Sequence, residues 1–342
     1  GYEGDTLASA LISNGIHLIG RSFKYHRPRG FLGVGVEEPN AMVQLHEGNK
    51  SEPNIMATEV ELVEGLKAKS QNCWPSVQFD VGEVNNLLNR FFPAGFYYKT
   101  FMWPKSFWMK IYEPFIRKAA GMGVAPLQPD PDRYEHNYEH CDVLVVGSGP
   151  SGLASALAAA KNGARVILAE DKANFGGSLL TDEVTIGNMS GKEWANDTVA
   201  QLKSLPNVIL KKRSQVFGYY DHNMTVMIER VSDHQENPSK YTPRQRLHYI
   251  RAGEVIVSTG SIERPISFGN NDRPGILLAS AAKEYMTVYE TLVGKKPIIF
   301  TNNDTAYSTA LEFLKNDIVP VILDTRNNSN GELVKEVKQK GV

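Results

Sequence analysis

The glycines and the acidic residue between positions 141 and 170 have the types and spacing of a dinucleotide-binding site. The stretch CDVLVVGSGPSG (141–152) contains Gly147, Gly149 and Gly152. In such a turn the first glycine permits a tight bend, the second lets the backbone approach a pyrophosphate, and the third lets a helix pack on a strand. Further on, RVILAE ends at Glu170, whose carboxylate can accept hydrogen bonds from an adenosine ribose.

A strand, a helix and a second strand must position these residues. Residues 142–146 form a short apolar run typical of a buried parallel strand, and residues 151–162 have an alanine-rich helical pattern. Amide groups at the helix start, around Ser151 and Gly152, would face the phosphates, aided by the helix dipole. A carboxylate at Glu170 disfavours a 2′-phosphate, so the motif indicates NAD or FAD rather than NADP. These residues alone do not separate NAD from FAD.

Two later stretches resemble the flavoprotein reductases that bind two dinucleotides. FGGSL (175–179) contains Gly177 and Ser178, and the strand in RAGEVIVSTGSIERP (251–265) ends at Thr259 and Gly260. In those reductases such a strand returns beside the first nucleotide. A hairpin is expected in QVFGYYDHNMTVMIERV, with its turn near residues 221–223. By the same resemblance, Val216 would reach the adenine through its backbone and Ser178 would lie near the phosphates.

The second nucleotide lobe of such reductases is expected here in a degenerate form. KKPIIFTNNDTAYSTALEFLKN predicts a strand at 297–300 and a helix at 306–315. The turn between them has side chains in place of glycines, including a carboxylate at Asp304, and these disfavour a pyrophosphate. The two cysteines, Cys73 and Cys141, lie far apart and form no redox pair. A stand-alone FAD-dependent pyridine nucleotide reductase is therefore the weaker alternative.

Composition excludes several other classes of protein. The 342 residues carry a formal net charge of −1, which gives no general attraction to nucleic acid or to an anionic membrane. No apolar run is long enough to span a membrane, and two unpaired cysteines fit a reducing cytoplasm. Because the chain starts at Gly1 and its last element stops in mid-pattern, we interpret it as a fragment of a longer subunit.

Four regions are expected, in an α/β fold combined with an α+β domain. Residues 1–90 read as a small α+β domain with a helix in GDTLASALISNG, and residues 91–140 as an aromatic-rich connector. Residues 141–293 would form the FAD/NAD(P)-binding Rossmann-like domain, and residues 294–342 the start of the degenerate lobe. The aromatic rings of residues 91–117 either pack on a domain surface or lie under another subunit.

Other candidate residues do not form a catalytic group. The run RSFKYHRPRG suggests a salt-bridged strand or a subunit contact rather than nucleic-acid binding. His136 and His140 have the i, i+4 spacing of metal ligands on a helix, but nearby prolines and a missing third ligand argue against a metal site. His26 has no visible partner either, so the catalytic residues are unknown.

Several stretches resemble one family, the alpha subunit of heterotetrameric sarcosine oxidase. They are GRSFKYHRPRG with EEPNA, ATEVELVEGLKAKSQNCWPS and GFYYKTFMWPKSFW. The resemblance implies an N-terminal 2Fe–2S ferredoxin-like domain that has lost its cluster, followed by a site that holds NAD+ noncovalently. Its contacts would come from Ser151, Glu170, Asp171, Lys172, Ser178 and Val216.

The resemblance also implies a multi-subunit enzyme. Sarcosine would be oxidised at FAD on a beta subunit, with FMN near the alpha–beta interface and with gamma and delta subunits completing the complex. A C-terminal half, absent from this sequence, would use tetrahydrofolate. The products would be glycine, hydrogen peroxide and either formaldehyde or 5,10-methylenetetrahydrofolate, and the fragment alone would be inactive. A subunit of a related N-methyl amino acid (dimethylglycine) or amine dehydrogenase or oxidase stays open as the alternative.

Overall fold

The computed structural model describes residues 1–342 except 3, 97, 98 and 100. The chain divides into two compact units. Unit 1 comprises Gly1–Pro131 and Arg264–Val342, and unit 2 comprises Asp132–Glu263. A compact unit defined by contacts can combine several domains, so the domain boundaries expected at 90, 140 and 293 stay predictions.

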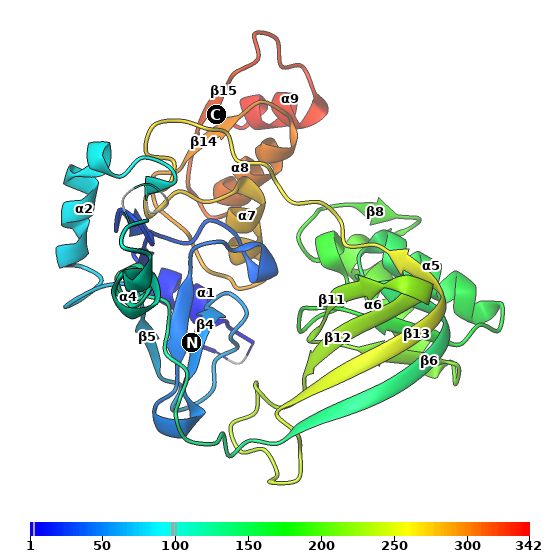
Figure 1. The fold of residues 1–342 in the computed structure, drawn as a ribbon. Coiled ribbons are helices and arrows are strands. Elements are labelled where there is room, and N and C mark those ends of the chain that lie inside the picture. Colours follow the sequence, from blue (N-terminus) through cyan, green and yellow to red (C-terminus); the bar gives the residue numbers. More distant parts are fainter. Residues whose placement is uncertain (3, 97–98, 100) are drawn as a thin grey trace. The chain divides into compact units, whose positions relative to one another are not determined.

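Unit 2 is built on a six-stranded mixed sheet with strand order β10-β7-β6-β13-β12-β11 (Figure 1). The first four of these strands run parallel, and β12 and β11 continue the sheet antiparallel. A two-stranded hairpin, β8 (Thr185–Ile186) and β9 (Met189–Ser190), lies outside it. The bounds of the six strands are β6 Tyr134–Val146, β7 Val166–Ala169, β10 Val208–Lys211, β11 Ser214–Tyr220, β12 Met224–Arg230 and β13 Gln245–Val257.

Two helices, α5 (Pro150–Lys161) and α6 (Gly191–Ser204), pack on one face of this sheet. Small residues on α5, such as Ala156, let the helix approach the strands closely, and Leu153 is fully buried against Val145. Ser190 and the Glu193 side chain form a capping box that fixes the start of α6. The predicted β–turn–α–β unit and the predicted hairpin, with its turn at Asp221–Asn223, are confirmed.

The strand β6 begins earlier than the sequence pattern indicated. We expected an apolar strand at 142–146, but β6 starts at Tyr134 because β13 pairs with it over nearly its whole length. His136 and His140 therefore lie on a strand, where residues four apart are separated by roughly 13 Å. The helical spacing considered for a metal site is wrong. Within the described residues no group of three His, Cys, Asp or Glu side chains could hold a metal ion.

A buried charge cluster lies on the opposite face of the sheet from α5 and α6. The fully buried His248 ring of β13 has Nδ1 2.7 Å from Glu139 Oε1 and Nε2 2.8 Å from Glu229 Oε2. Burial lowers the pKa of His248, but the two carboxylates outweigh it and raise the pKa overall. The hydrogen bond from His248 in turn lowers the pKa of Glu139 to about 2. This cluster joins β6, β12 and β13 across the sheet.

Unit 1 contains a small α+β core. Helix α1 (Leu7–Ser13) confirms the helix predicted in GDTLASALISNG. Its N-cap residue, Thr6, forms a capping box with Ser9. A three-stranded antiparallel sheet has the order β4-β3-β5. A short antiparallel pair, β1–β2, precedes these strands in the sequence. These strands are β1 Gly20–Arg21, β2 Pro28–Arg29, β3 Met42–Leu45, β4 Glu52–Met56 and β5 Ala68–Ser70.

Helix α7 (Ala279–Thr287), which follows unit 2 in the chain, completes this core. Its Tyr285 and Ala281 are buried in one cluster with Ala8, Phe31 and Val43. The Tyr285 hydroxyl also donates to the Gly33 carbonyl at 3.2 Å. Residues that precede unit 2 in the sequence and residues that follow it therefore share one hydrophobic core.

The end of the chain forms the predicted strand and helix of the degenerate lobe. β14 (Ile298–Thr301) leads into α8 (Thr305–Lys315), and β15 (Val321–Asp324) pairs parallel with β14 before α9 (Glu332–Gln339). Buried residues of α7, α8 and α9 pack together there, among them Met286, Phe313 and Val337. No described helix is long and apolar enough to cross a membrane.

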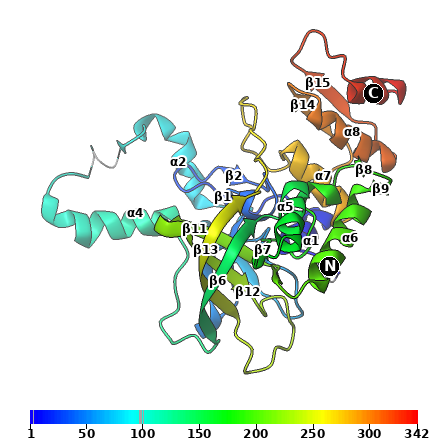
Figure 2. The same ribbon diagram turned by 90° about the vertical axis from the view of Figure 1, so that its right-hand side faces the viewer.

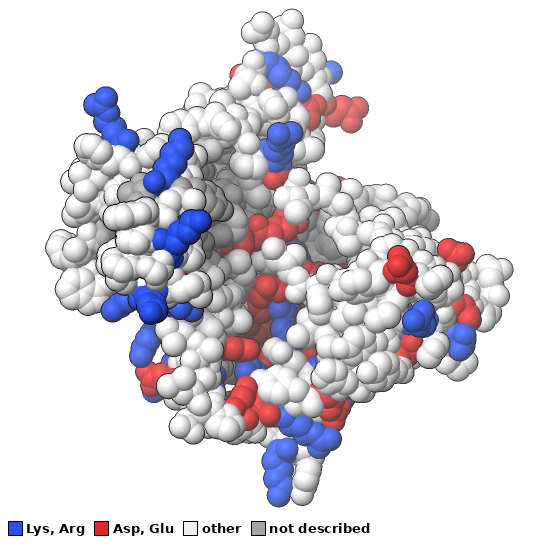
Figure 3. Space-filling model, in the orientation of Figure 1, with Lys and Arg blue, Asp and Glu red and all other residues white. Residues whose placement is uncertain are grey.

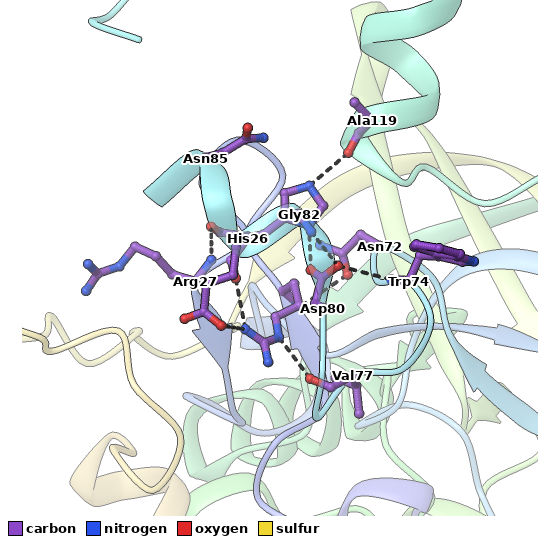
Figure 4. A network of polar contacts seen from close by, with 12 residues as sticks. His26, Arg27, Asn72, Trp74, Val77, Asp80, Gly82, Asn85 and Ala119 are labelled. Atoms are coloured by element: carbon purple, nitrogen blue, oxygen red, sulfur yellow. Dashed lines mark hydrogen bonds and ion pairs between the residues drawn. The ribbon is translucent and has the colours of Figure 1, made fainter. Parts of the chain in front are cut away.

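The basic run at 21–29 is engaged within unit 1 (Figure 4). Arg21 donates to the carbonyls of Val77, Gln78 and His26 and pairs with Glu83 at 2.9 Å. The His26 ring lies 2.6 Å from the Asp80 carboxylate and 3.1 Å from the Ala119 carbonyl. Arg27 and Arg29 both pair with Asp272. These contacts favour the salt-bridged interpretation over a nucleic-acid surface.

Residues 101–124, here called the aromatic segment, expose large apolar side chains. Helix α4 (Glu113–Ala120) belongs to it and lies at the edge of unit 1, as does α2 (Val84–Leu87) (Figure 2). Trp103 is 82% exposed and Phe115 71%. Lys and Arg side chains gather over the same region (Figure 3). Its exposed basic residues are Lys105, Lys110, Arg117 and Lys118. Some rings, such as Phe101 and Trp108, are half-buried, whereas Trp103 and Phe115 are left largely exposed among the described residues, so both interpretations stay predictions.

Candidate functional site

The glycine turn between β6 and α5 has the backbone geometry of a phosphate-binding turn. Gly147 has a φ of +93°, and a Cβ there would collide with the Ser258 carbonyl. A Cβ on Gly152 would collide with the Gly147 carbonyl, so helix and strand pack without a side chain between them. Nothing lies within 4 Å of the place where a Cβ of Gly149 would stand. The turn therefore leaves open space at the one glycine expected to meet a pyrophosphate.

The FGGSL stretch packs directly against this turn. A Cβ on Gly177 would lie 2.8 Å from the Gly149 Cα, which requires glycine at that position. Ser178 follows in a 3-10 turn and is exposed, as is Ser151 in the first turn of α5. The Ser258 N–H donates to the Val146 carbonyl at 2.7 Å. Thr259 and Gly260, both exposed, follow from there. Most of the predicted contact residues therefore gather around one open turn.

Glu170 lies at the end of β7 and is 5% exposed. Its carboxylate accepts the Ser148 N–H at 3.0 Å, the Ser148 hydroxyl through a short contact, and the Lys172 N–H at 3.1 Å. Burial, with Asp171 adding to it, raises the pKa of Glu170 to about 7. Three hydrogen bonds use part of the acceptor capacity of a carboxylate, which offers about four lone-pair positions. The acid at this site therefore holds the turn in place, and its expected contact with a ribose stays a prediction.

Ser148 is a residue of the candidate site that the sequence reasoning missed. Its hydroxyl donates to Glu170 and accepts the Gly176 N–H at 3.1 Å, and the residue is fully buried. It therefore ties the phosphate turn, the acid and the FGGSL stretch together. The available signal was a serine, rather than a small apolar residue, between the first two glycines of the motif.

The remaining predicted contacts lie beside the acid. The Ser214 N–H at the start of β11 donates to the Glu170 carbonyl at 2.7 Å, and Val216 follows two residues on, half-buried. Arg213 donates its N–H to the Lys172 carbonyl, and Arg230 donates to the Asp171 carbonyl at 2.8 Å. Asp171 and Lys172 therefore follow the acid directly, and Val216 lies two residues from the Ser214 that bonds to the Glu170 carbonyl.

The turn of the second lobe is filled by its own side chains. Asn303 Oδ1 accepts the Thr305 N–H at 2.9 Å, and Asp304 pairs with Arg326 at 2.7 Å. Arg326 also pairs with Asp324 at the end of β15, at 2.7 Å. A carboxylate and an asparagine side chain occupy a turn that would need bare backbone to hold a pyrophosphate. This arrangement supports the prediction of a degenerate second site.

The fold and these features define a dinucleotide-binding oxidoreductase domain joined to a ferredoxin-like domain. Residues 142–222 match the family described as FAD dependent oxidoreductase, and residues 1–73 match the 2Fe-2S iron-sulfur cluster binding domain. The structure of L-proline dehydrogenase from P. horikoshii shares the fold, with a TM-score of 0.61 and 19% identity over 97% of this chain and 52% of that one.

Sequence comparison finds similar proteins in other bacteria. The chain is 52% identical to sarcosine oxidase subunit alpha of Rhizobium meliloti (strain 1021) over 94% of its own length and 33% of that protein. It is 34% identical to the corresponding subunit of Corynebacterium sp. (strain P-1) over 95% of its length and 29% of that protein. The chain is therefore a homologue of the sarcosine oxidase alpha subunits and spans about a third of their length.

Proposed function

We propose that this chain is the nucleotide-holding part of the alpha subunit of a multi-subunit sarcosine oxidase, and that its nucleotide is NAD+. The observation that carries the proposal is the open space at Gly149 in a turn whose other two glycines leave no room for a side chain. The similarity to alpha subunits of sarcosine oxidase supports the proposal that the chain belongs to such a subunit.

In this proposal the backbone of Gly147, Gly149 and Gly152 receives the pyrophosphate, with Ser151 and Ser178 as hydroxyl donors. Glu170 faces the adenosine ribose, and Asp171, Lys172 and Val216 border the adenosine. Gly177, Thr259 and Gly260 complete the lining of the proposed nucleotide site. The dinucleotide supplies binding energy to unit 2, and we propose no hydride transfer to it.

A flavin at this turn is the competing assignment. The matched family of residues 142–222 is described as FAD dependent, and the residues of the turn suit both dinucleotides. The filled second turn, with Asp304 paired to Arg326, favours NAD+. A reductase that held FAD in unit 2 would need an intact second site to receive NAD(P)H.

The complete enzyme would oxidise sarcosine on a beta subunit carrying FAD, with FMN at the alpha–beta interface and gamma and delta subunits present. Glycine and hydrogen peroxide would form, with formaldehyde or, at a tetrahydrofolate site outside this sequence, 5,10-methylenetetrahydrofolate. A related N-methylated substrate such as dimethylglycine is the alternative. The free thiols of Cys73 and Cys141 support a cytoplasmic location.

The aromatic segment is the surface we assign to contact with another subunit of this enzyme. Its exposed rings, such as Trp103 and Phe115, are the residue types enriched at interface centres. The surrounding lysines and arginines would complement an acidic rim on the partner.

The test is to co-express the full-length alpha chain with its candidate partner subunits, denature the purified complex and separate the released nucleotides. NAD+ recovered in proportion to the alpha chain, with flavin traced to the other chains, supports the proposal. An alpha chain that is yellow, carries FAD and oxidises NADH by itself would overturn it.

A further inference from the structure

A buried carboxylate lies at the centre of the loop formed by residues 32–41 of unit 1, here called the 32–41 loop. The Glu38 side chain is 1% exposed. Its Oε2 accepts the N–H groups of Leu32 and Gly33 at 2.7 and 2.8 Å, and its Oε1 accepts those of Asn40 and Ala41 at 2.6 and 3.1 Å. Four main-chain donors therefore converge on one internal anion.

Two buried hydroxyl groups close the same loop from outside it. The Thr58 hydroxyl donates to the Gly35 carbonyl at 2.7 Å, and the Tyr285 hydroxyl of α7 donates to the Gly33 carbonyl. Thr58 is 2% exposed and Tyr285 is fully buried. The loop is thus held both by Glu38 from within and by its neighbours.

The loop falls inside the region that matches an iron–sulfur cluster domain, residues 1–73. Plant-type [2Fe–2S] clusters are held by thiolates in a C-x4-C-x2-C run with a fourth cysteine further along. Two sets of residues in the 32–41 loop have that spacing, Leu32, Glu37 and Asn40 or Gly33, Glu38 and Ala41, and neither contains a thiol. The burial and hydrogen bonds of Glu38 favour the second set. Cys73 is the single cysteine of unit 1, and burial raises the pKa of its thiol. The residues present do not fit a cluster.

We propose that the Glu38 carboxylate replaces an iron–sulfur cluster as the anion that organises the 32–41 loop. Clusters also accept hydrogen bonds at their sulfurs, so a loop shaped around a cluster points main-chain N–H groups inward. Without the cluster, those buried N–H groups would have no hydrogen-bond acceptor, which would destabilise the fold. A glutamate at the middle ligand position satisfies four of them, and the domain keeps its fold without metal.

The effects on the pKa of Glu38 are consistent with an ionised carboxylate that its surroundings stabilise. Burial raises the pKa of Glu38, and the four N–H donors act against that shift by stabilising the ionised form. The arrangement is independent of the nucleotide in unit 2, because every group in it belongs to unit 1.

The decisive experiment is hydrogen exchange, followed by mass spectrometry, on the full-length chain in its complex. Glu38→Gln keeps the size of the side chain but turns an NH2 group toward two of the four donors. We expect amides of the 32–41 loop to exchange at least tenfold faster in Glu38→Gln, with peptides of unit 2 unchanged. Glu64→Gln, at an exposed glutamate of the same unit, is the matched control and should change nothing. Equal exchange of the loop in wild type and Glu38→Gln would overturn the proposal.

Metal content gives the second measurement. Cells supplied with iron and sulfide should yield a complex whose iron and acid-labile sulfide do not change in Cys73→Ser, the variant that removes the one thiol of unit 1. Iron that disappears in Cys73→Ser would show that this domain binds a cluster after all, and the assignment of Glu38 would be wrong. If Glu38→Ala fails to fold, Glu38→Gln still carries the exchange test.

Discussion

Valine at position 149 should separate nucleotide binding from folding. Gly149 has a φ of −64° and a ψ of −175°, which any residue adopts without strain, and no atom lies within 4 Å of its would-be Cβ. Gly149→Val should therefore change the free energy of unfolding of the nucleotide-free protein by no more than about 1 kcal/mol. The isopropyl group would stand where the pyrophosphate must approach.

The magnitude follows from linkage. A ligand at one hundred times its dissociation constant stabilises the native state by about 2.7 kcal/mol, which for a unit of this size raises the melting temperature by roughly 5–10 °C. Calorimetry of the wild-type complex, first stripped of its nucleotide and then given NAD+ again, should show that shift, and Gly149→Val treated in the same way should show none. Gly269→Val, at a glycine of unit 1 with equally open surroundings, should keep the shift.

Two results would refute this reasoning. If Gly149→Val retains the full NAD+-induced shift, the pyrophosphate does not lie at this turn. If the nucleotide-free variant loses several kcal/mol of stability, the space around Gly149 is not open, and any loss of binding would be a by-product of misfolding.

Three further predictions concern other parts of the chain. Ser148→Ala should lower the free energy of unfolding of unit 2 by about 1–3 kcal/mol and weaken nucleotide retention, as measured by urea denaturation and nucleotide release; unchanged values would mean that its hydroxyl does not tie the turn together. The raised pKa of His248 contributes stability that is complete at low pH and disappears as pH rises through that pKa, above about 6.5. Glu139→Gln should weaken the pH dependence of the urea denaturation midpoint between pH 5 and 9. If the midpoint depends on pH as strongly as in wild type, the His248–Glu139 pair is not the source of that dependence. Trp103→Ser combined with Lys110→Glu should reduce assembly in native mass spectrometry without lowering the melting temperature of unit 1, whereas intact assembly would place the subunit contact elsewhere.

The sequence predicted those parts of the fold whose signals are local. The glycine turn, the helix after it and the hairpin at Asp221–Asn223 all depend on residues close together in the chain, and the structure confirms them. The residues proposed to contact the nucleotide come from five separate stretches, which pairing between distant strands brings together. Their binding role stays a prediction.

The parts that sequence reasoning missed depend on distant pairing. The first half of β6 is polar and becomes a strand because β13, more than a hundred residues later, pairs with it. That pairing places His136 on a strand instead of a helix. Ser148 gains its role from Gly176, 28 positions away, whereas Glu38 is an exception that bonds only to residues two to six positions away. Neither residue stands out in a pattern of apolar and polar positions.

The shared core of unit 1 has a consequence for the order of events during synthesis. Tyr285 meets Gly33 across 252 positions of chain, and unit 2 lies entirely between them. At roughly 5–20 residues per second, a ribosome needs on the order of 10–50 s to deliver α7 after the first strands have emerged. During that interval Phe31 and Val43 lack part of their cover, whereas unit 2 is continuous and can fold as soon as it is made. The unit that begins the chain is therefore the one that finishes folding last.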